Sequence, residues 1–311
     1  MAQPIIGIDM GGTSVKLGVC QGSAVLHKDE PITTEDFPGA DAIVAEMARR
    51  VRSLRERHPQ VAAIGVGVPG FVDAKTGIVH ELTNVPGWRE VLLGRELREM
   101  TGLPAVAEND ANCMGVAEWR HGAARGLTDF LAITLGTGVG GAVFVNGSLY
   151  HGARSGAGEV GQMSIDYRGV DGPHGNVGAL ERYVGNRQIA DRAQSLYAAA
   201  GKTKSDDECS PALLAAAAER GEAVALQVWE EFTTQLACSL ANCCWLLNPQ
   251  AIIIGGGIAA AGDLIFAPLR KKLAAQLAGP FRDNLLVVPA HFRNDAGIIG
   301  AAAIAEDLAR D

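Results

Sequence analysis

The chain has 311 residues, of which 48% are hydrophobic and 20% are charged, as in a globular protein with room for two domains. Its formal net charge of -8 and the lack of a Lys/Arg cluster argue against nucleic acid or a membrane surface as a partner. No stretch approaches the ~18 apolar residues that span a bilayer. We expect no signal peptide, because no basic region and long apolar run precede the strand-like segment 5–9. The six cysteines include no C-x-x-C pair and fit neither a zinc site nor a disulfide scaffold, so we expect reduced thiols in a cytoplasmic protein.

The first part of the chain alternates apolar strands with amphipathic helices. We expect strands over 5–9, 15–20, 61–69 and 104–108, and helices over 39–58, 89–101 and 111–120. A Gly-Gly turn joins the first two strands, and Gly102 is placed to end the second helix.

The second part begins with a similar plan. Strands over 130–135 and 142–145 flank a glycine-rich turn, and this arrangement weakly repeats that of residues 6–19. The glycine-rich segment 152–180 is expected to be a functional loop. The remaining predicted elements are helices over 180–200, 211–247 and 298–309, and strands over 251–254 and 285–289. This alternation predicts an α/β protein.

The first turn, Asp9-Met10-Gly11-Gly12-Thr13, has the composition of a phosphate-binding loop. Glycines let backbone N–H groups approach phosphate oxygens. The Asp9 carboxylate is suited to hold Mg²⁺, directly or through water. An ordinary glycine turn capped by Asp9 is the alternative.

The second turn reads G-x-G-x-x-G from Gly136 to Gly141. A dinucleotide-binding loop would lead into a helix, whereas a strand follows here, so we expect a second phosphate loop rather than an NAD site. No Walker A motif is present in the sequence.

A third cluster, Gly255 to Gly257, follows an apolar strand. It could face an adenosine, although a plain strand-to-helix turn is favoured by this segment alone.

The segment from Glu108 to Asn112 places Asp110 where a strand gives way to a helix. A carboxylate there can accept the proton of an attacking hydroxyl, which contributes roughly 10²–10⁴-fold. Helix N-caps also favour Asp and Asn, so the segment leaves both interpretations open. Asn84, Glu159 and Glu181 carry the polar groups that a polyol needs, but each is also typical of an ordinary surface position.

Together these motifs resemble the ROK family of sugar kinases and sugar-responsive repressors, over nearly the whole chain. The matching motifs, in the family's order, are Asp9-x-Gly-Gly-Thr13, Pro69-Gly70, Asn84-x-Pro-Gly-Trp88, Glu108-Asn-Asp-Ala-Asn112, Gly136-Thr-Gly-x-Gly140, Gly158-Glu-x-Gly161 and Gly255-Gly-Gly257. Residues 122–126 look most like the glucokinase branch. Because the Asp9 turn begins so near the first residue, we expect no helix-turn-helix and no repressor function.

The resemblance implies an actin- and hexokinase-like (ribonuclease H-like) fold with a cleft between two α/β lobes, 1–115 plus 297–311 and 116–296. It implies ATP-dependent phosphorylation of a hexose hydroxyl, with the 6-hydroxyl of glucose expected. The alternatives are kinases for N-acetylmannosamine, N-acetylglucosamine, fructose or allose, and a sugar-binding sensor without activity. Polyphosphate in place of ATP stays open. Relatives are commonly dimers, so we expect a homodimer.

The resemblance also implies roles for individual residues. Asp110 is the catalytic base. The sugar-binding residues are Gly70, Asn84, Asn109, Asp110, Glu159, Gln162 and Glu181. The residues that bind ATP, with Mg²⁺ at Asp9, are Asp9, Gly11, Gly12, Thr13, Lys16, Thr137, Gly138, Gly256 and Gly257.

The sequence departs from the family at a structural zinc site. Many members carry one His and three Cys as zinc ligands; these positions hold Gln162, Gly172, His174 and Ala179 here. A closed zinc site needs four ligands, so we expect no zinc. The His of zinc-bearing relatives also helps to hold the sugar, which makes Gln162 a candidate determinant of sugar preference.

Overall fold

The computed structural model describes residues 3–82 and 85–309, and its chain divides into two compact units. Unit 1 comprises Met1–Gly126, Leu149–Ala157 and His291–Asp311, and unit 2 comprises Leu127–Ser148 and Gly158–Ala290. The lobe boundaries expected near residues 115 and 296 stay a prediction.

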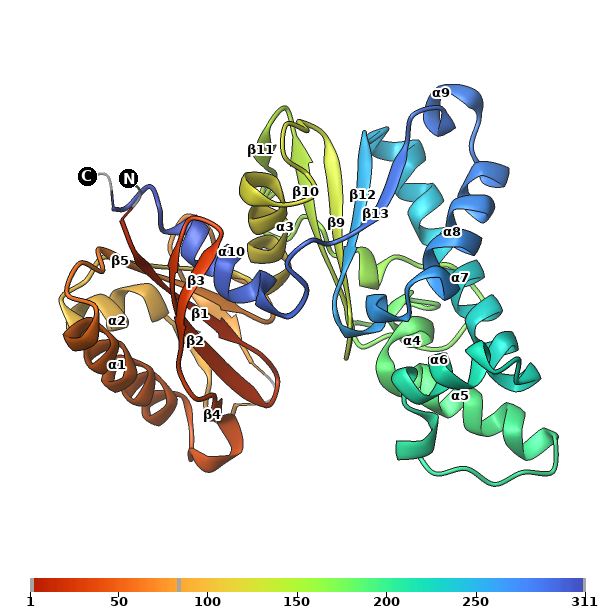
Figure 1. Cartoon of the computed structure of the whole chain (residues 1–311), viewed down its shortest axis with the longest axis horizontal. Helices are drawn as coiled ribbons and strands as arrows, with labels where there is room; N and C mark the ends of the chain where they lie inside the picture. The colour runs from red at the N-terminus through yellow and green to blue at the C-terminus, as the bar shows by residue number, and fades with distance from the viewer. Residues whose placement is uncertain (1–2, 83–84, 310–311) are drawn as a thin grey trace. The chain divides into compact units, whose positions relative to one another are not determined.

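Unit 1 is built on a mixed sheet with the strand order β3-β2-β1-β5-β8, and β4 pairs with β2 (Figure 1). Its strands are β1 (Ile5–Met10), β2 (Ser14–Gln21), β3 (Ala24–Lys28), β4 (Ile32–Thr33), β5 (Ala63–Val68) and β8 (Ala105–Asn109). The β1–β2 hairpin is antiparallel, whereas β5 and β8 continue the sheet in parallel, as α/β units require. A small ribbon pairs β6 (Val79–Glu81) with β7 (Arg89–Val91).

Helices cover both faces of this sheet because the apolar side chains of β1 and β5 alternate between the two faces. On one face, α1 (Ala40–Arg57) and α2 (Leu93–Thr101) bury their apolar stripes against Ile6, Ile8 and Ile64. On the other face, α10 (Ala296–Ile304) packs against β1, β5 and α3 (Asp110–His121). The core of unit 1 therefore lies in two layers around one sheet.

Unit 2 repeats this plan, with the strand order β11-β10-β9-β12-β13. Its strands are β9 (Phe130–Leu135), β10 (Val139–Val145), β11 (Ser148–Leu149), β12 (Ala251–Gly255) and β13 (Leu286–Pro289). β9 and β10 are antiparallel neighbours, and β12 and β13 then extend the sheet in parallel from β9. The weak repeat noticed in the sequence thus corresponds to two sheets of one topology.

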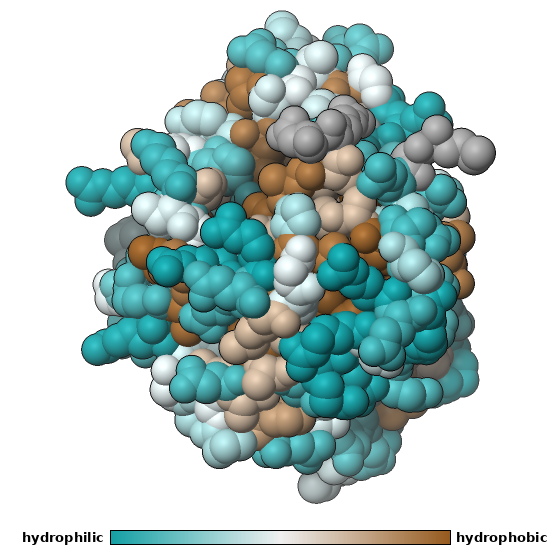
Figure 2. All heavy atoms as spheres, turned by 90° about the vertical axis from the view of Figure 1, so that its left-hand side faces the viewer, coloured by the Kyte–Doolittle hydropathy of each residue, from teal (hydrophilic) through white to brown (hydrophobic). Residues whose placement is uncertain are grey.

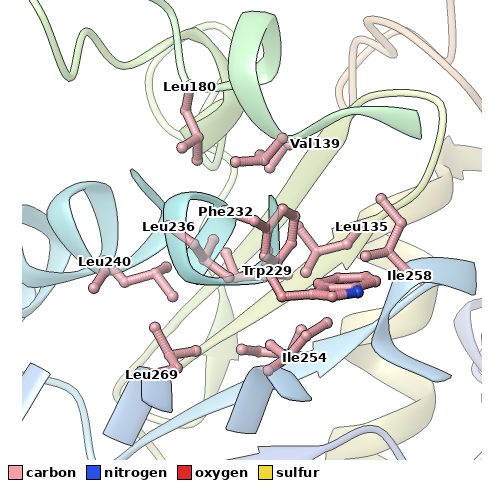
Figure 3. Close-up of a cluster of buried hydrophobic side chains, with 14 of the residues drawn as sticks. Leu135, Val139, Leu180, Trp229, Phe232, Leu236, Leu240, Ile254, Ile258 and Leu269 are labelled. Atoms are coloured by element: carbon pink, nitrogen blue, oxygen red, sulfur yellow. The ribbon is translucent and has the colours of Figure 1, made fainter. Parts of the chain in front are cut away.

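The long helix α7 (Ala223–Leu247) supplies the centre of the core in unit 2. Figure 3 shows Trp229, Phe232 and Leu236 of this helix beside Leu135 and Ile254 of the sheet. The other helices are α4 (Glu181–Val184), α5 (Asn186–Ala199), α6 (Pro211–Glu219), α8 (Asp263–Gln276) and α9 (Gly279–Arg282). Single 3₁₀ turns are η1 (Thr34–Asp36), η2 (Val160–Gln162), η3 (Asp207–Cys209), η4 (Gly257–Ala261) and η5 (Arg293–Asp295).

Three predicted elements were wrong in detail. Residues 89–91 form β7 rather than the start of α2, because they pair with β6. The helix predicted over 180–200 is interrupted at Gly185, which has extended backbone. The helix predicted over 211–247 breaks near Gly221, whose φ of 79° lies in the left-handed region that ends helices.

Hydrophilic side chains predominate on the face drawn in Figure 2, with smaller hydrophobic areas between them. Among the helices of the described residues, none combines the length and apolarity needed to cross a membrane.

Candidate active site

Two motifs that are far apart in sequence meet at one edge of the first sheet. The ladder pairs Asp9 of β1 with Gly67 of β5, and Gly67 with Glu108 of β8. The chain then continues from β5 into Gly70 and from β8 into Asp110. Parallel strands present their carboxyl ends at the same edge, which is where α/β proteins bind ligands.

The Asp9 carboxylate is largely withdrawn from solvent, with 19% of its side chain exposed. Burial raises its pKa, and the charge of Lys16, whose Nζ lies 3.9 Å from Asp9 Oδ2, opposes this shift. The turn that follows is closed by a hydrogen bond from Gly11 N to Ser14 O at 2.8 Å, and Gly12 and Thr13 are exposed. The predicted loop thus presents backbone beside a buried carboxylate.

This donor set fits Mg²⁺. The ion favours hard oxygen ligands and keeps several waters, and it is commonly held by one or two carboxylates together with substrate phosphates. Asp9 supplies such a carboxylate. In the described parts of the chain, no group of three or more His, Cys, Asp or Glu side chains is arranged to hold a metal ion by protein ligands alone.

Asn109, not Asp110, caps helix α3. Asn109 Oδ1 accepts hydrogen bonds from the backbone N–H groups of Ala111 at 2.9 Å and Asn112 at 3.1 Å. Its Nδ2 donates to the carbonyl oxygen of Gly70 at 3.0 Å. Asp110 is therefore the first residue of the helix, where the helix dipole favours its ionised form. Asn109 occupies the N-cap position, and Asp110 Oδ1 also accepts the backbone N–H of Ala111 at 2.8 Å.

Glu108 lies behind this segment with both carboxylate oxygens engaged. Oε1 accepts from the backbone N–H of Asn109 at 2.7 Å and from Nδ2 of Asn112 at 2.9 Å. Oε2 lies 2.7 Å from Nε2 of His151. Sequence reasoning missed His151, since it lies 43 residues away in an irregular loop and no motif contains it.

In unit 2, Glu181 contacts the second glycine turn. Its Oε2 accepts the backbone N–H of Val139 at 3.0 Å. A Cβ on Gly138 would lie 2.2 Å from that same oxygen, so any other residue there would displace the Glu181 carboxylate. The backbone N–H of Asn186, at the start of α5, donates to the carbonyl of Gly136 at 2.9 Å. The turn that contains Thr137 and Gly138 is thus held by α4 and α5.

Glu159 and Gln162 lie close to Glu181. Burial raises the pKa of Glu159, and the charge of Glu181 adds to the rise. Gln162 Nε2 lies 3.5 Å from Glu181 Oε1. Gln162 Oε1 is buried and has no hydrogen-bond partner within the described residues, so an acceptor remains for a ligand hydroxyl.

The loop at the family's zinc positions is held by hydrogen bonds. Asn176 Nδ2 donates to the carbonyl of Gln162 at 2.8 Å, and the backbone N–H of Val170 donates to the hydroxyl of Tyr183 at 3.2 Å. Isolated bridges pair Ser164 with Ala179 and Asp171 with Val177. These bonds tie the loop to Gln162 at one end and to α4, which carries Glu181, at the other.

Gly256 is packed against the second glycine turn. Its φ is 87°, and a Cβ on it would lie 2.2 Å from the carbonyl oxygen of Leu135, immediately before Gly136. Gly257 is exposed, with open space where its Cβ would be. Asn84, the remaining predicted sugar ligand, lies outside the described residues.

Residues 5–308 match the model of the ROK family, and the chain belongs to this family. A glucokinase from Halalkalibacterium halodurans is 32% identical over 312 residues, covering 95% of this chain and 92% of that protein. A β-glucoside kinase from Listeria monocytogenes is 32% identical over 299 residues, covering 96% and 95%. The crystal structure of a ROK family glucokinase from Streptomyces griseus in complex with glucose and AMPPNP gives a TM-score of 0.83 at 32% identity, covering 99% of both chains. The predicted family and the actin- and hexokinase-like fold are confirmed.

Proposed function

We propose that this chain is an ATP-dependent sugar kinase that phosphorylates the 6-hydroxyl of glucose. Kinase and glucokinase relatives matched over nearly their whole length support the activity. The observation that carries it is the sheet edge where Asp9 of β1 and Glu108 of β8 both align with Gly67 of the intervening strand β5, and β8 ends directly before Asp110. A carboxylate suited to hold Mg²⁺ beside a glycine turn, and a second carboxylate suited to act as a base at a helix start, are groups that phosphoryl-transfer enzymes use.

In the proposed mechanism, Asp110 accepts the proton of the sugar hydroxyl as its oxygen attacks the γ-phosphoryl group, and the bond from that phosphorus to the β,γ-bridging oxygen breaks to release ADP. The transition state is loose, so positioning and electrostatic stabilisation account for most of the rate. Mg²⁺ bound with ATP would neutralise phosphate charge, and Asp9 would hold it directly or through water. Backbone N–H groups of the two glycine turns would receive the phosphate oxygens.

The remaining roles follow the family pattern residue by residue. Gln162 would offer its unpartnered Oε1 to a sugar hydroxyl, and Glu159 and Glu181 would accept further hydroxyl protons. The other proposed sugar ligands are Gly70, Asn84 and Asn109. The proposed nucleotide ligands are Gly11, Gly12, Thr13, Lys16, Thr137, Gly138, Gly256 and Gly257. We also propose a cytoplasmic homodimer, on the resemblance alone.

A kinase for another sugar is the second candidate, and the β-glucoside kinase relative favours it. The specific observation is Gln162, whose amide replaces the imidazole of zinc-bearing relatives at a position facing Glu181. N-acetylhexosamines, fructose and β-glucosides are therefore the competing acceptors.

An ADP-release assay with Mg·ATP across these sugars separates the candidates. We expect kcat/KM for glucose to exceed that for every other sugar. Preference for another sugar would keep the kinase and change the acceptor. A protein that binds a sugar without any turnover would be a sensor, and the proposal would fail.

A further inference from the structure

Glu108 is a buried acid that takes part in three hydrogen bonds, two of them with the segment that starts α3. Only 10% of its side chain is exposed. Two of its bonds go to Asn109 and Asn112, within the same segment. Among its described contacts, only His151 comes from elsewhere in the chain. Glu108 therefore connects the start of α3 to a distant loop.

The loop that carries His151 is itself anchored in unit 1. Residues Leu149–Ala157 belong to unit 1, although the chain before and after them belongs to unit 2. The hydroxyl of Ser155 accepts the backbone N–H of Ala74 at 3.0 Å, and Ala157 N donates to the carbonyl of His151 at 3.0 Å. The imidazole is thus presented to Glu108 from a docked segment.

We propose that His151 is a positioning residue for phosphoryl transfer, which acts through Glu108 to hold Asn109 and Asp110 in place. The inference rests on the proposed function, in which Asp110 is the base. His151 itself touches neither substrate nor reacting atoms in this account.

The chain of bonds gives the physical reason. Asn109 is fixed at its backbone N–H by Glu108, and at its side chain by Gly70 and the first turn of α3. Asp110 follows directly, so its backbone inherits this constraint. A displacement of about 1 Å at such a group can cost on the order of 10²-fold in rate.

Electrostatics strengthen the bond between His151 and Glu108. This hydrogen bond raises the pKa of His151, so a larger share of the imidazole is charged near neutrality. Charge-assisted hydrogen bonds are roughly twice as strong as neutral ones. Without His151, Oε2 of a buried carboxylate would lose its partner, which is strongly unfavourable. Glu108 would then rotate away from this position, and its hold on Asn109 would weaken.

The test compares wild type, His151→Ala and His151→Gln in steady-state kinetics with the preferred sugar and Mg·ATP. We expect His151→Ala to lower kcat by about 10-fold to 10²-fold, with a smaller change in KM. His151→Gln can still donate to Glu108 and should recover most of the loss. A Glu108→Ala variant should lower kcat too, and adding His151→Ala to it should cost little more, since the two act as one unit.

His80→Ala is the matched control. His80 Nδ1 lies 2.8 Å from Glu90 Oε1, in an exposed pair of the same kind and the same unit. The His80→Ala variant should leave kcat unchanged. If His151→Ala does not fold, as judged by thermal unfolding, His151→Gln and Glu108→Gln carry the test.

The outcomes separate the two proposals. If the wild type phosphorylates a sugar and His151→Ala has the same kcat, the positioning role is overturned and the proposed kinase function stands. The positioning role is also overturned if His151→Gln is as impaired as His151→Ala and the impairment is a rise in KM rather than a fall in kcat. Wild type that phosphorylates no sugar overturns the proposed function, and the positioning role falls with it.

Discussion

The two glycine turns occupy the same place in two sheets of one topology, yet they are built differently. Counted from the last cross-strand pair, Asp9 and Lys16 of unit 1 correspond to Thr134 and Gly140 of unit 2. The first turn has its own carboxylate and ammonium group within the hairpin. The second turn has no charged side chain at these positions of its hairpin, and it contacts the Glu181 carboxylate of α4 instead.

The two proposed phosphate turns therefore obtain their charged groups in different ways. In unit 1, a strand residue brings the charge, so a metal ion can join the phosphate there. In unit 2, the backbone of the turn faces a carboxylate that is also a proposed sugar ligand. The second turn therefore contacts Glu181, a proposed sugar ligand, whereas the first carries the Asp9–Lys16 pair within its own hairpin.

The largest effect is expected at Asp110, beside the first turn. Asp110→Asn should lower kcat by about 10²–10⁴-fold, because the amide cannot accept the hydroxyl proton. Thermal stability should change little, since Asn109 keeps the cap of α3. Steady-state kinetics, with calorimetric sugar binding as the control, check this. A near-normal kcat would remove Asp110 from the mechanism.

Asp9→Asn should separate activity from stability. Burial raises the pKa of Asp9 in the folded state, so the unfolded chain releases this proton at lower pH. Between the ordinary and the raised pKa the folded state binds more protons, and wild-type stability falls as pH rises through this window. Asp9→Asn is neutral at every pH, so its stability does not fall through this window. It should therefore unfold at higher temperature than wild type at pH 7 without ligand.

The same Asp9→Asn variant should lose kcat/KM for Mg·ATP, because the metal-binding carboxylate is gone. Unfolding curves at acidic and neutral pH, together with kinetics, check both expectations. If wild type is the more stable protein at pH 7 while the two converge in acid, the carboxylate is stabilising and the burial argument is wrong.

The sequence predicts the residues of the first turn more completely than those of the second. Asp9, both glycines and Thr13 are consecutive, so a local motif holds the whole turn. The partner of Gly138 is Glu181, far along the chain, and no spacing indicates that contact. The same limit hid His151, which meets Glu108 only through the tertiary fold.

The fold itself was largely predictable. Apolar strands and amphipathic helices gave the α/β class, and the recurring strand–turn–strand plan corresponds to the two sheets. The errors arose where tertiary pairing or a single glycine decided the outcome, as in β7 and at Gly221. The N-cap of α3 was ambiguous because Asn109 and Asp110 are both good caps; the structure places Asn109 at the cap, where it accepts from both Ala111 and Asn112.

Gly138→Ala tests the link between the second turn and Glu181. The new methyl group would collide with Glu181 Oε2, and relief of such overpacking costs about 1–3 kcal/mol. We expect a lower melting temperature and higher KM values for both ATP and sugar. Gly136→Ala, with open space at its Cβ, is the matched control for stability. A rise in KM for ATP alone would argue against this link.

The smallest effect is expected in the loop at the zinc positions. Asn176→Ala removes the bond to the carbonyl of Gln162, worth about 0.5–1.5 kcal/mol. Loss of this energy can raise a dissociation constant by at most about 10-fold, so we expect KM for the sugar to rise a few-fold. Kinetics with sugar and ATP varied separately check it, and Ser164→Ala, an exposed neighbour, serves as control. An unchanged KM for the sugar would mean that the loop does not support Gln162.

The most direct test of the kinase is the identity of its product. Phosphorus NMR of a reaction with Mg·ATP and glucose should show phosphate on the C6 oxygen with wild type and almost none with Asp110→Asn. Phosphate on no sugar, or equal product from both proteins, would contradict the account.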